Sequence, residues 1–185
     1  MRKLRRDEVV DWQTWTDRRP AELARILAVK EPRRVHLGPH LTFLFESADT
    51  VRWQVQEMMR VERIVREADV QHEIDTYNEL LGGDGELGCT LLVEIDDPAD
   101  RARKLAEWRD LPDALYLERA DGERVRPVVD RRQIGEDRLS AVQYLRFPVR
   151  GEAPVAIGSD HPAYAHRAPL APAQRAALAE DLRSA

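Results

Sequence analysis

A carboxylate placed among apolar residues is the first feature of this sequence that could do chemistry. In residues 51–66 (VRWQVQEMMRVERIVR), a helical period of 100° per residue puts Glu62 on the apolar face. That face is formed by Val51, Val55, Met58 and Val65. A lone buried carboxylate costs several kcal/mol, so we expect Glu62 to have a partner: an arginine, a metal ion or a proton.

A second helix, expected over residues 70–81, supplies further polar groups. If it packs antiparallel to the first helix, Glu73 faces Glu62, with His72 beside it. Paired helices that present Glu and His side chains bind metals such as iron, manganese or zinc, which makes Glu62, Glu73 and His72 candidate metal ligands. Neither segment contains the Glu-x-x-His pair typical of such sites. A structural Glu–Arg or Glu–Tyr contact is therefore the alternative interpretation.

The histidines form two further groups. His36 and His40 flank a Gly38-Pro39 turn, and His161 and His166 lie in a segment rich in Pro and Gly. Two histidines and a carboxylate are enough for a metal site or an acid–base site. Loop histidines beside prolines more often have neither role, and we expect that here.

Strand alternation places a third set of polar residues. Glu94 shares a face with Thr90, and Arg146 shares a face with Tyr144 on another strand, opposite Gln143. The pattern predicts a cross-strand ion pair between Glu94 and Arg146. Cys89, the single cysteine, lies in an apolar strand with no cation beside it, which indicates a buried and unreactive thiol.

Composition excludes several classes of protein. The chain has 185 residues, 34 acidic and 29 basic, and a formal net charge of −5. No run approaches the roughly 20 apolar residues that cross a bilayer. Because residues 1–12 also lack the apolar core of a secretory signal, we expect a cytoplasmic protein with no membrane partner. Residues 1–35 are locally basic, but without an RNA-recognition strand nucleic acid is not the expected partner.

The fold expected to position these residues is of the α+β class. The pattern predicts an antiparallel sheet of about four to six strands, packed with an N-terminal helical region and a central helical hairpin. We expect one domain over residues 1–150, with a helical arm over about residues 1–34 that is divided in two at Pro20. Residues 151–185 are expected to form a Pro/Gly-containing tail, a loop over 150–171 followed by a short helix. The predicted strands are residues 35–46 (a hairpin), 87–95, 115–119, 125–129 and 139–147.

Four runs of the sequence resemble the bacterial domain of unknown function 3501 family. They are FLFESADTVRWQVQEMMRVERI, HEIDTYNELL, GDGELGCTLLVEI and EDRLSAVQYLRF, in collinear order within about residues 20–148. The family has no assigned reaction, so no catalytic residue is carried over. The resemblance implies a role beside rubrerythrin-like and iron–sulfur proteins, because members of this family are often encoded near them.

The resemblance also marks a candidate pocket. It consists of the polar residues that interrupt apolar elements within these runs: Gln56, Glu57, Arg60, Glu62, Glu73, Tyr77, Asn78, Glu94, Gln143, Tyr144 and Arg146. The first hypothesis is an accessory or binding protein of non-haem iron or iron–sulfur redox or oxidative-stress systems. One alternative is an enzyme that uses a buried Glu as general acid/base or metal ligand. The other is a nucleic-acid or protein-interaction module that uses the basic N-terminal arm.

Overall fold

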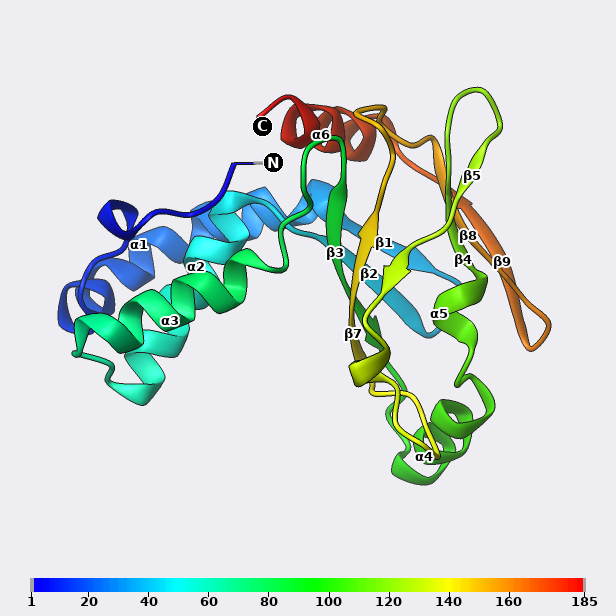
Figure 1. Cartoon of the computed structure of the whole chain (residues 1–185), viewed down its shortest axis with the longest axis horizontal. Helices are drawn as coiled ribbons and strands as arrows, with labels where there is room; N and C mark the ends of the chain where they lie inside the picture. The colour runs from blue at the N-terminus through cyan, green and yellow to red at the C-terminus, as the bar shows by residue number, and fades with distance from the viewer. Residues whose placement is uncertain (1, 185) are drawn as a thin grey trace.

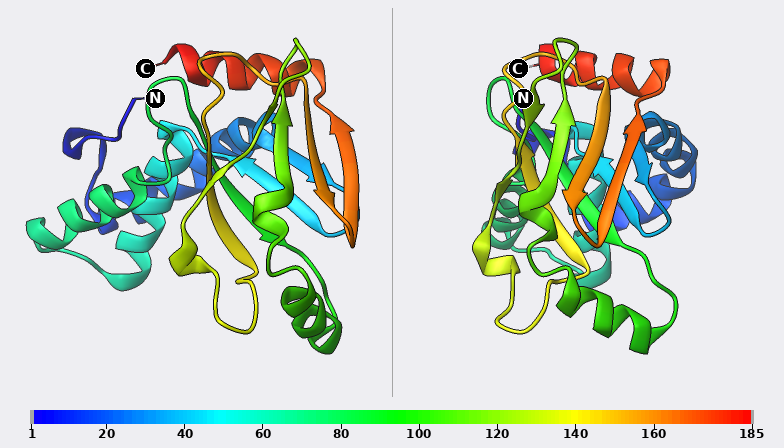
Figure 2. Two further views of the ribbon diagram at one scale, coloured as in Figure 1. Left: turned by 45° about the vertical axis from the view of Figure 1, so that its right-hand side comes forward. Right: turned by 90° about the vertical axis from the view of Figure 1, so that its right-hand side faces the viewer.

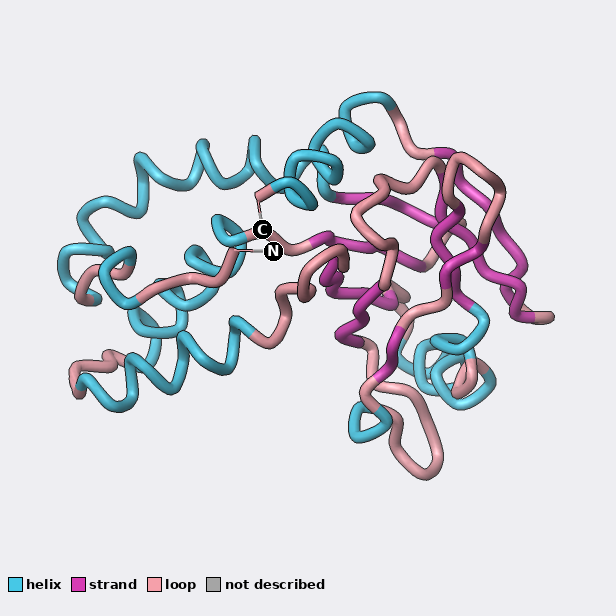
Figure 3. The backbone as a smooth tube through the Cα atoms, turned by 45° about the horizontal axis from the view of Figure 1, so that its top comes forward, coloured by secondary structure: helices cyan, strands magenta, loops and turns pink. Residues whose placement is uncertain are grey.

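The computed structural model describes residues 2–184, which form a helical lobe beside a two-sheet β lobe (Figure 1). The tube view in Figure 3 separates the two lobes clearly. The helical lobe consists of α1 (Trp12–Lys30), α2 (Ala48–Glu62) and α3 (Glu67–Asn78), preceded by the 3-10 turn η1 (Arg6–Glu8). None of the helices within residues 2–184 combines the length and the apolar character needed to cross a bilayer.

Two antiparallel sheets build the β lobe, so the predicted α+β class is confirmed. The first sheet has the order β1-β2-β3-β7-β6 and the second β5-β4-β8-β9. The first sheet contains β1 (Arg34–Leu37), β2 (Leu41–Phe45), β3 (Leu87–Val93), β7 (Val142–Phe147) and β6 (Val128–Val129). The second contains β5 (Arg124–Val125), β4 (Leu115–Glu118), β8 (Ala156–His161) and β9 (Tyr164–Pro169). The connecting helices are η2 (Glu31–Arg33), α4 (Pro98–Glu107), α5 (Leu111–Ala114), η3 (Arg131–Gln133) and the final α6 (Pro172–Arg183).

The expected loop over residues 150–171 is wrong, because most of it is the β8–β9 hairpin. Figure 2 shows this hairpin (orange) in the second sheet, with α6 (red) across one end of the lobe. β8 pairs with β4 in the register Leu117↔Ile157. The Tyr164 hydroxyl also donates a hydrogen bond of 2.6 Å to the Leu37 carbonyl, which ties this hairpin to β1. Pairing with distant strands, rather than local propensity, makes this segment extended.

The N-terminal segment also differs from the prediction, since α1 runs through Pro20 as one helix. The helix begins after Asp11, whose carboxylate accepts hydrogen bonds from the backbone N–H groups of Gln13 and Thr14. Trp15 and Ile26 are both buried, on either side of the proline. Packing of these two side chains, one before and one after Pro20, outweighs the one backbone hydrogen bond that the proline removes.

The main core lies between the two sheets and contains Phe43, Phe45 and Phe147. Cys89 is buried in this core, and burial raises the pKa of its thiol well above the ordinary value, as expected for an unreactive cysteine. The helical lobe has a separate apolar cluster built around Val51, Val55 and Met59 on α2, together with Val70 and Ile74 on α3. The first sheet therefore has one core face and one outer face, and the outer face meets the helical lobe.

Candidate functional site

A groove of about 700 Å³ lies where α3 ends against the outer face of the first sheet. Beside it is a smaller cavity of about 160 Å³. The two spaces share Tyr77, Leu80 and Tyr144 as walls, and we refer to them together as the junction groove. Its size is within the range of about 300–1,000 Å³ that is usual for small-molecule sites, and its position between two lobes is also typical.

Glu46 lies at the smaller end of the junction groove with 7% of its surface exposed. It follows β2 and precedes Ser47, the N-cap of α2, so the partial positive charge at the start of that helix favours its carboxylate. The Thr50 hydroxyl donates to one carboxylate oxygen at 2.5 Å and the Thr90 hydroxyl to the other at 2.6 Å. These contacts fix the orientation of Glu46 towards the cavity.

Lys30 enters the same cavity from the C-terminal end of α1. Its side chain is partly buried, and among residues 2–184 no hydrogen-bond acceptor or carboxylate lies within bonding distance of its ammonium. Burial lowers the pKa of Lys30, an effect that the Glu46 carboxylate opposes and the Arg34 guanidinium strengthens. A desolvated ammonium with no partner in a cavity is a group ready for a ligand oxygen.

Two tyrosines form the walls between the groove and the cavity. Burial raises the pKa of Tyr77, while a hydrogen bond with Gln54 lowers it. Tyr144 is 42% exposed, and its face of β7 also presents Val142, which is 37% exposed. The middle of the junction groove is therefore aromatic and apolar, and the polar groups lie towards its ends.

A second lysine, Lys3, lies at the far end of the groove, and its ammonium already has hydrogen-bond partners in the protein. The Lys3 ammonium donates to the backbone carbonyls of Asn78 at 2.6 Å and Leu81 at 3.0 Å, which satisfies the C-terminal end of α3. Burial lowers the pKa of Lys3, and Arg146 contributes in the same direction. Lys3 thus closes the groove structurally, whereas Lys30 is free to bind.

Of the residues expected to form a pocket, three line the junction groove: Tyr77, Tyr144 and Arg146. Asn78 lies next to it but is committed to the N-terminal segment. Its amide oxygen accepts from the Leu4 backbone at 2.8 Å, and its amide nitrogen donates to the Leu4 carbonyl at 2.9 Å.

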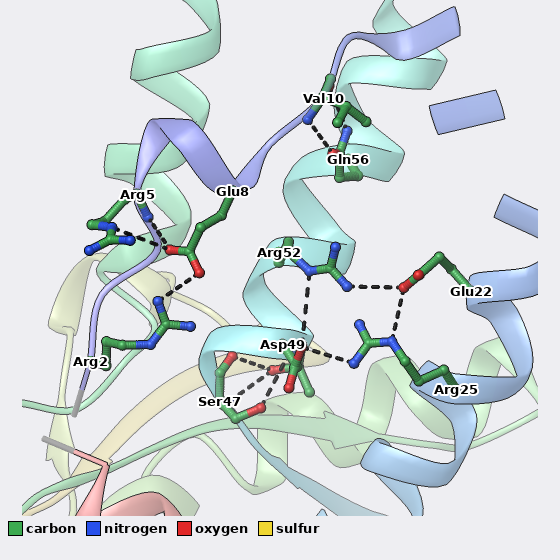
Figure 4. A network of polar contacts seen from close by, with 11 residues as sticks. Arg2, Arg5, Glu8, Val10, Glu22, Arg25, Ser47, Asp49, Arg52 and Gln56 are labelled. Carbon is green, nitrogen blue, oxygen red and sulfur yellow. Dashed lines mark hydrogen bonds and ion pairs between the residues drawn. The ribbon is translucent and has the colours of Figure 1, made fainter. Parts of the chain in front are cut away.

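Three others hold the helical lobe together and do not reach the groove. Glu57 accepts a hydrogen bond of 2.9 Å from Trp15 and forms ion pairs with Arg19 and Arg60. The side-chain amide of Gln56 bonds both backbone groups of Val10, at 2.8 and 3.0 Å (Figure 4). Glu57 and Gln56 thus make structural contacts, and the Glu57–Arg pairs are of the kind that the alternative to a metal site predicted.

The burial predicted for Glu62 is wrong, since its side chain is exposed. Glu62 has the helical phase of the apolar face, but it is the last residue of α2, and Arg63 follows in the left-handed conformation at φ 52°. His72 is also exposed and Glu73 is half-buried, so the expected pair of facing carboxylates is not formed. Within residues 2–184 no three His, Cys, Asp or Glu side chains are grouped closely enough to hold a metal ion.

The expected Glu94–Arg146 pair is also wrong, for a reason of register. β3 and β7 pair with Gly88 opposite Arg146, which brings Arg146 to 3.7 Å from Glu86. Glu94 lies beyond the other end of β3, where it accepts a hydrogen bond from the Thr42 hydroxyl.

Gln143 faces the core rather than the groove. Its amide nitrogen donates to the backbone carbonyls of Gln133, Ser140 and Val142. The opposite face of β7 carries Tyr144 and Arg146, so the predicted alternation along this strand is confirmed.

The histidines of the hairpin are strand residues instead of loop residues. His161 is buried, with its Nε2 atom 3.0 Å from an Asp110 oxygen and its Nδ1 atom accepting from the Ala163 N–H. His40 and His166 both lie near the Tyr164 ring, with ring centroids 6.3 and 4.5 Å away. None of these histidines lines the junction groove.

Sequence reasoning missed Lys30 and Glu46, the two charged groups of the smaller cavity. One signal for Lys30 was present, because the chain has only three lysines against 26 arginines. Glu46 ends the otherwise apolar run Leu41–Phe45, which is an unusual position for a charge. Neither signal connects the two residues, which meet only through packing of α1 against the sheet.

Comparison with known proteins places the chain in a family. A crystal structure of a protein from Burkholderia pseudomallei, described as a novel protein of unknown function, is 32% identical to this chain. The similarity covers 98% of this chain and 100% of that one, with a TM-score of 0.89. No curated protein matches the sequence. The family described as "Protein of unknown function (DUF3501)" matches residues 3–182, and the chain therefore belongs to the DUF3501 family.

Proposed function

We propose that this protein binds a small organic molecule in the junction groove. The ligand presents a hydrogen-bond-accepting oxygen, of a carboxylate or a carbonyl, to Lys30, and its planar apolar part lies between Tyr77 and Tyr144. The observation that carries the proposal is the partly buried ammonium of Lys30, which lines the cavity without a bonding partner among residues 2–184.

The charges around the cavity favour a ligand that accepts a hydrogen bond over a ligand that donates one. Both oxygens of Glu46 already accept hydroxyl hydrogen bonds, from Thr50 and Thr90. Lys30 has lost part of its hydration and has gained no protein acceptor in return, so a ligand oxygen offers it the larger stabilisation. A cationic ligand would instead repel this ammonium.

The two other lysines, Lys3 and Lys104, differ from Lys30 in their surroundings. Lys3 is held by two backbone carbonyls. The Lys104 ammonium lies 5.0 Å from the centre of the Trp108 ring, outside the junction groove. Only Lys30 combines partial burial, a cavity and the lack of a partner within the described chain.

Isothermal titration calorimetry with three aromatic probes tests the proposal. We expect benzoate and benzamide to bind the wild-type protein, and benzylamine, which offers a cation and no oxygen, to bind more weakly or not at all. In Lys30→Met the affinity for benzoate is expected to fall about tenfold or more, the value of one charge-assisted hydrogen bond. Lys104→Met is the matched control and should bind as the wild type does.

Thermal unfolding distinguishes a lost contact from a damaged fold. Because Lys30→Met removes a desolvated charge with no partner, the variant should be as stable as the wild type or more stable. Equal affinity for benzoate and benzylamine, or a Lys30→Met variant that binds benzoate normally, would refute the proposal.

The wider role that the family resemblance implies is part of the proposal: an accessory or binding protein of non-haem iron or iron–sulfur redox systems, with rubrerythrin-like or iron–sulfur proteins as partners. Membership of the DUF3501 family supports it only through that resemblance. Size-exclusion chromatography of the chain mixed with a rubrerythrin-like protein from the same organism tests it. Co-elution at equimolar ratio is expected, and separate elution at micromolar concentrations of both proteins would contradict it.

A further inference from the structure

We propose that Lys30 is a nucleophile that joins an aldehyde or ketone ligand to the protein as a reversible imine. The inference rests on the proposed function and deepens it, because it assigns the ligand oxygen at Lys30 to a carbonyl group that reacts. It gives the junction groove an activity in addition to binding.

The placement of Lys30 meets the needs of an amine nucleophile. An amine attacks only when it is neutral, and a lysine becomes reactive when it is desolvated and is not held as a cation by a close carboxylate. Lys30 is partly buried, and no carboxylate oxygen of residues 2–184 lies within ion-pair distance of it. The lowering of its pKa by burial agrees with this geometry.

The same cavity holds the groups that the reaction needs for proton transfer. The neutral amine attacks the carbonyl carbon, a C–N bond forms, and the carbonyl oxygen becomes an alkoxide. Two protons leave the nitrogen and reach that oxygen, which departs as water and leaves the C=N bond, so no oxidant or reductant is required. Glu46 is the carboxylate that lines the cavity; because it lies beyond ion-pair distance of Lys30, it accepts the proton from nitrogen and returns it to oxygen through a water molecule.

The aromatic walls would hold the rest of the ligand and exclude water from the imine. Tyr77 and Tyr144 border the cavity on its open side, towards the larger groove. A planar conjugated carbonyl compound fits these walls best, because ring stacking on tyrosine adds to apolar burial. Hydrolysis of the imine by the reverse steps releases the ligand unchanged.

Reductive trapping tests the inference directly. The whole protein is incubated with benzaldehyde and sodium cyanoborohydride, digested, and the benzylated lysines are mapped by mass spectrometry. Since only Lys3, Lys30 and Lys104 are present, each site is resolved, with the N-terminal amine scored separately. We expect Lys30 to be labelled about tenfold faster than Lys104, because its amine lies in the cavity, where burial lowers its pKa.

Two variants and a binding measurement on the wild type separate this inference from the proposed function. Lys30→Arg cannot form an imine, so it should lose the label at position 30, whereas Lys104→Arg should keep the label at Lys30 and the wild-type affinity for benzoate. Labelling of Lys104 as fast as that of Lys30 in the wild type, with benzoate still bound by the wild type, would overturn the imine and leave a non-covalent site. A wild-type protein that binds no benzoate would overturn the proposed function.

Discussion

Arg33 and Asp181 form a two-point ion pair that joins η2 to α6. The Nε–Oδ2 and Nη2–Oδ1 distances are both 2.8 Å, the Asp181 side chain is buried, and the Arg33 side chain is 11% exposed. Burial raises the pKa of Asp181, and the Arg33 guanidinium opposes that shift. The parallel geometry of the two contacts is that of a guanidinium with an ionised carboxylate.

Removal of one partner from this pair should be strongly destabilising. Arg33→Met leaves a buried carboxylate without its cation and is expected to lower the free energy of unfolding by about 3–5 kcal/mol. The double variant Arg33→Met/Asp181→Leu should recover most of that loss, because no buried charge remains. Urea denaturation of the three variants measures both effects.

The control for the Arg33 series is an exposed pair. Arg25 pairs with Glu22 and Asp49 at the surface of the helical lobe (Figure 4). Arg25→Met should cost about 1 kcal/mol or less. Equal losses in Arg25→Met and Arg33→Met would contradict a role for burial.

Tyr164→Phe tests the link between the β8–β9 hairpin and the first hairpin. The Tyr164 hydroxyl donates to the Leu37 carbonyl and accepts from the His40 N–H at 2.9 Å. We expect the variant to lose about 1–3 kcal/mol of stability, because two buried backbone groups lose their partner. Tyr116→Phe is the matched control: its ring is buried, but its hydroxyl makes no hydrogen bond within the described residues, so denaturation should show little change.

We expect Glu57 to contribute to the way the free energy of unfolding changes with pH in the acidic range. Burial disfavours its charge, but hydrogen bonds from Arg60, Trp15 and Arg19 outweigh burial and hold its pKa below the ordinary value. A carboxyl whose folded-state pKa is lowered stabilises the fold above its unfolded pKa, and the contribution is lost as the pH falls.

Glu57→Gln should therefore cost about 1.5–3 kcal/mol at pH 7, and the gap from wild type should narrow as the pH falls from 7 through the acidic range in which carboxyl groups are protonated. Guanidinium denaturation across that range measures the gap. Glu62→Gln, at an exposed carboxylate, is the control and should be about as stable as the wild type at pH 7. A gap that stays constant with pH would mean that the charge of Glu57 is not what stabilises the lobe.

Local periodicity correctly predicted those helices and strands whose buried face can be recognised from a few consecutive residues. β7 is an example, since its alternation correctly places Leu145 inside and Tyr144 outside. The position of Glu62 could not be predicted in this way. Its helical phase is correct, but phase does not reveal that the helix ends at Glu62 and leaves this side chain exposed.

The candidate site was only partly predictable for a related reason. Tyr77 and Tyr144 interrupt apolar elements, and that pattern is visible in the sequence. Lys30 and Glu46 instead stand at the ends of α1 and β2, far apart in the sequence, and their proximity is a property of packing between lobes. The β8–β9 hairpin was missed because its strands are stabilised by β4, about forty residues earlier in the chain.

The bond from Tyr164 to Leu37 spans 127 residues, and this separation has a consequence for folding. During synthesis, β1, β2, β3 and β7 are all available once residue 147 has emerged, but the second sheet lacks β8 and β9. The inner face that carries Phe43 and Phe147 therefore stays partly uncovered until the hairpin arrives. Such non-local closure is slow, and for this interval the nascent chain offers aromatic surface to chaperones or to other unfinished chains.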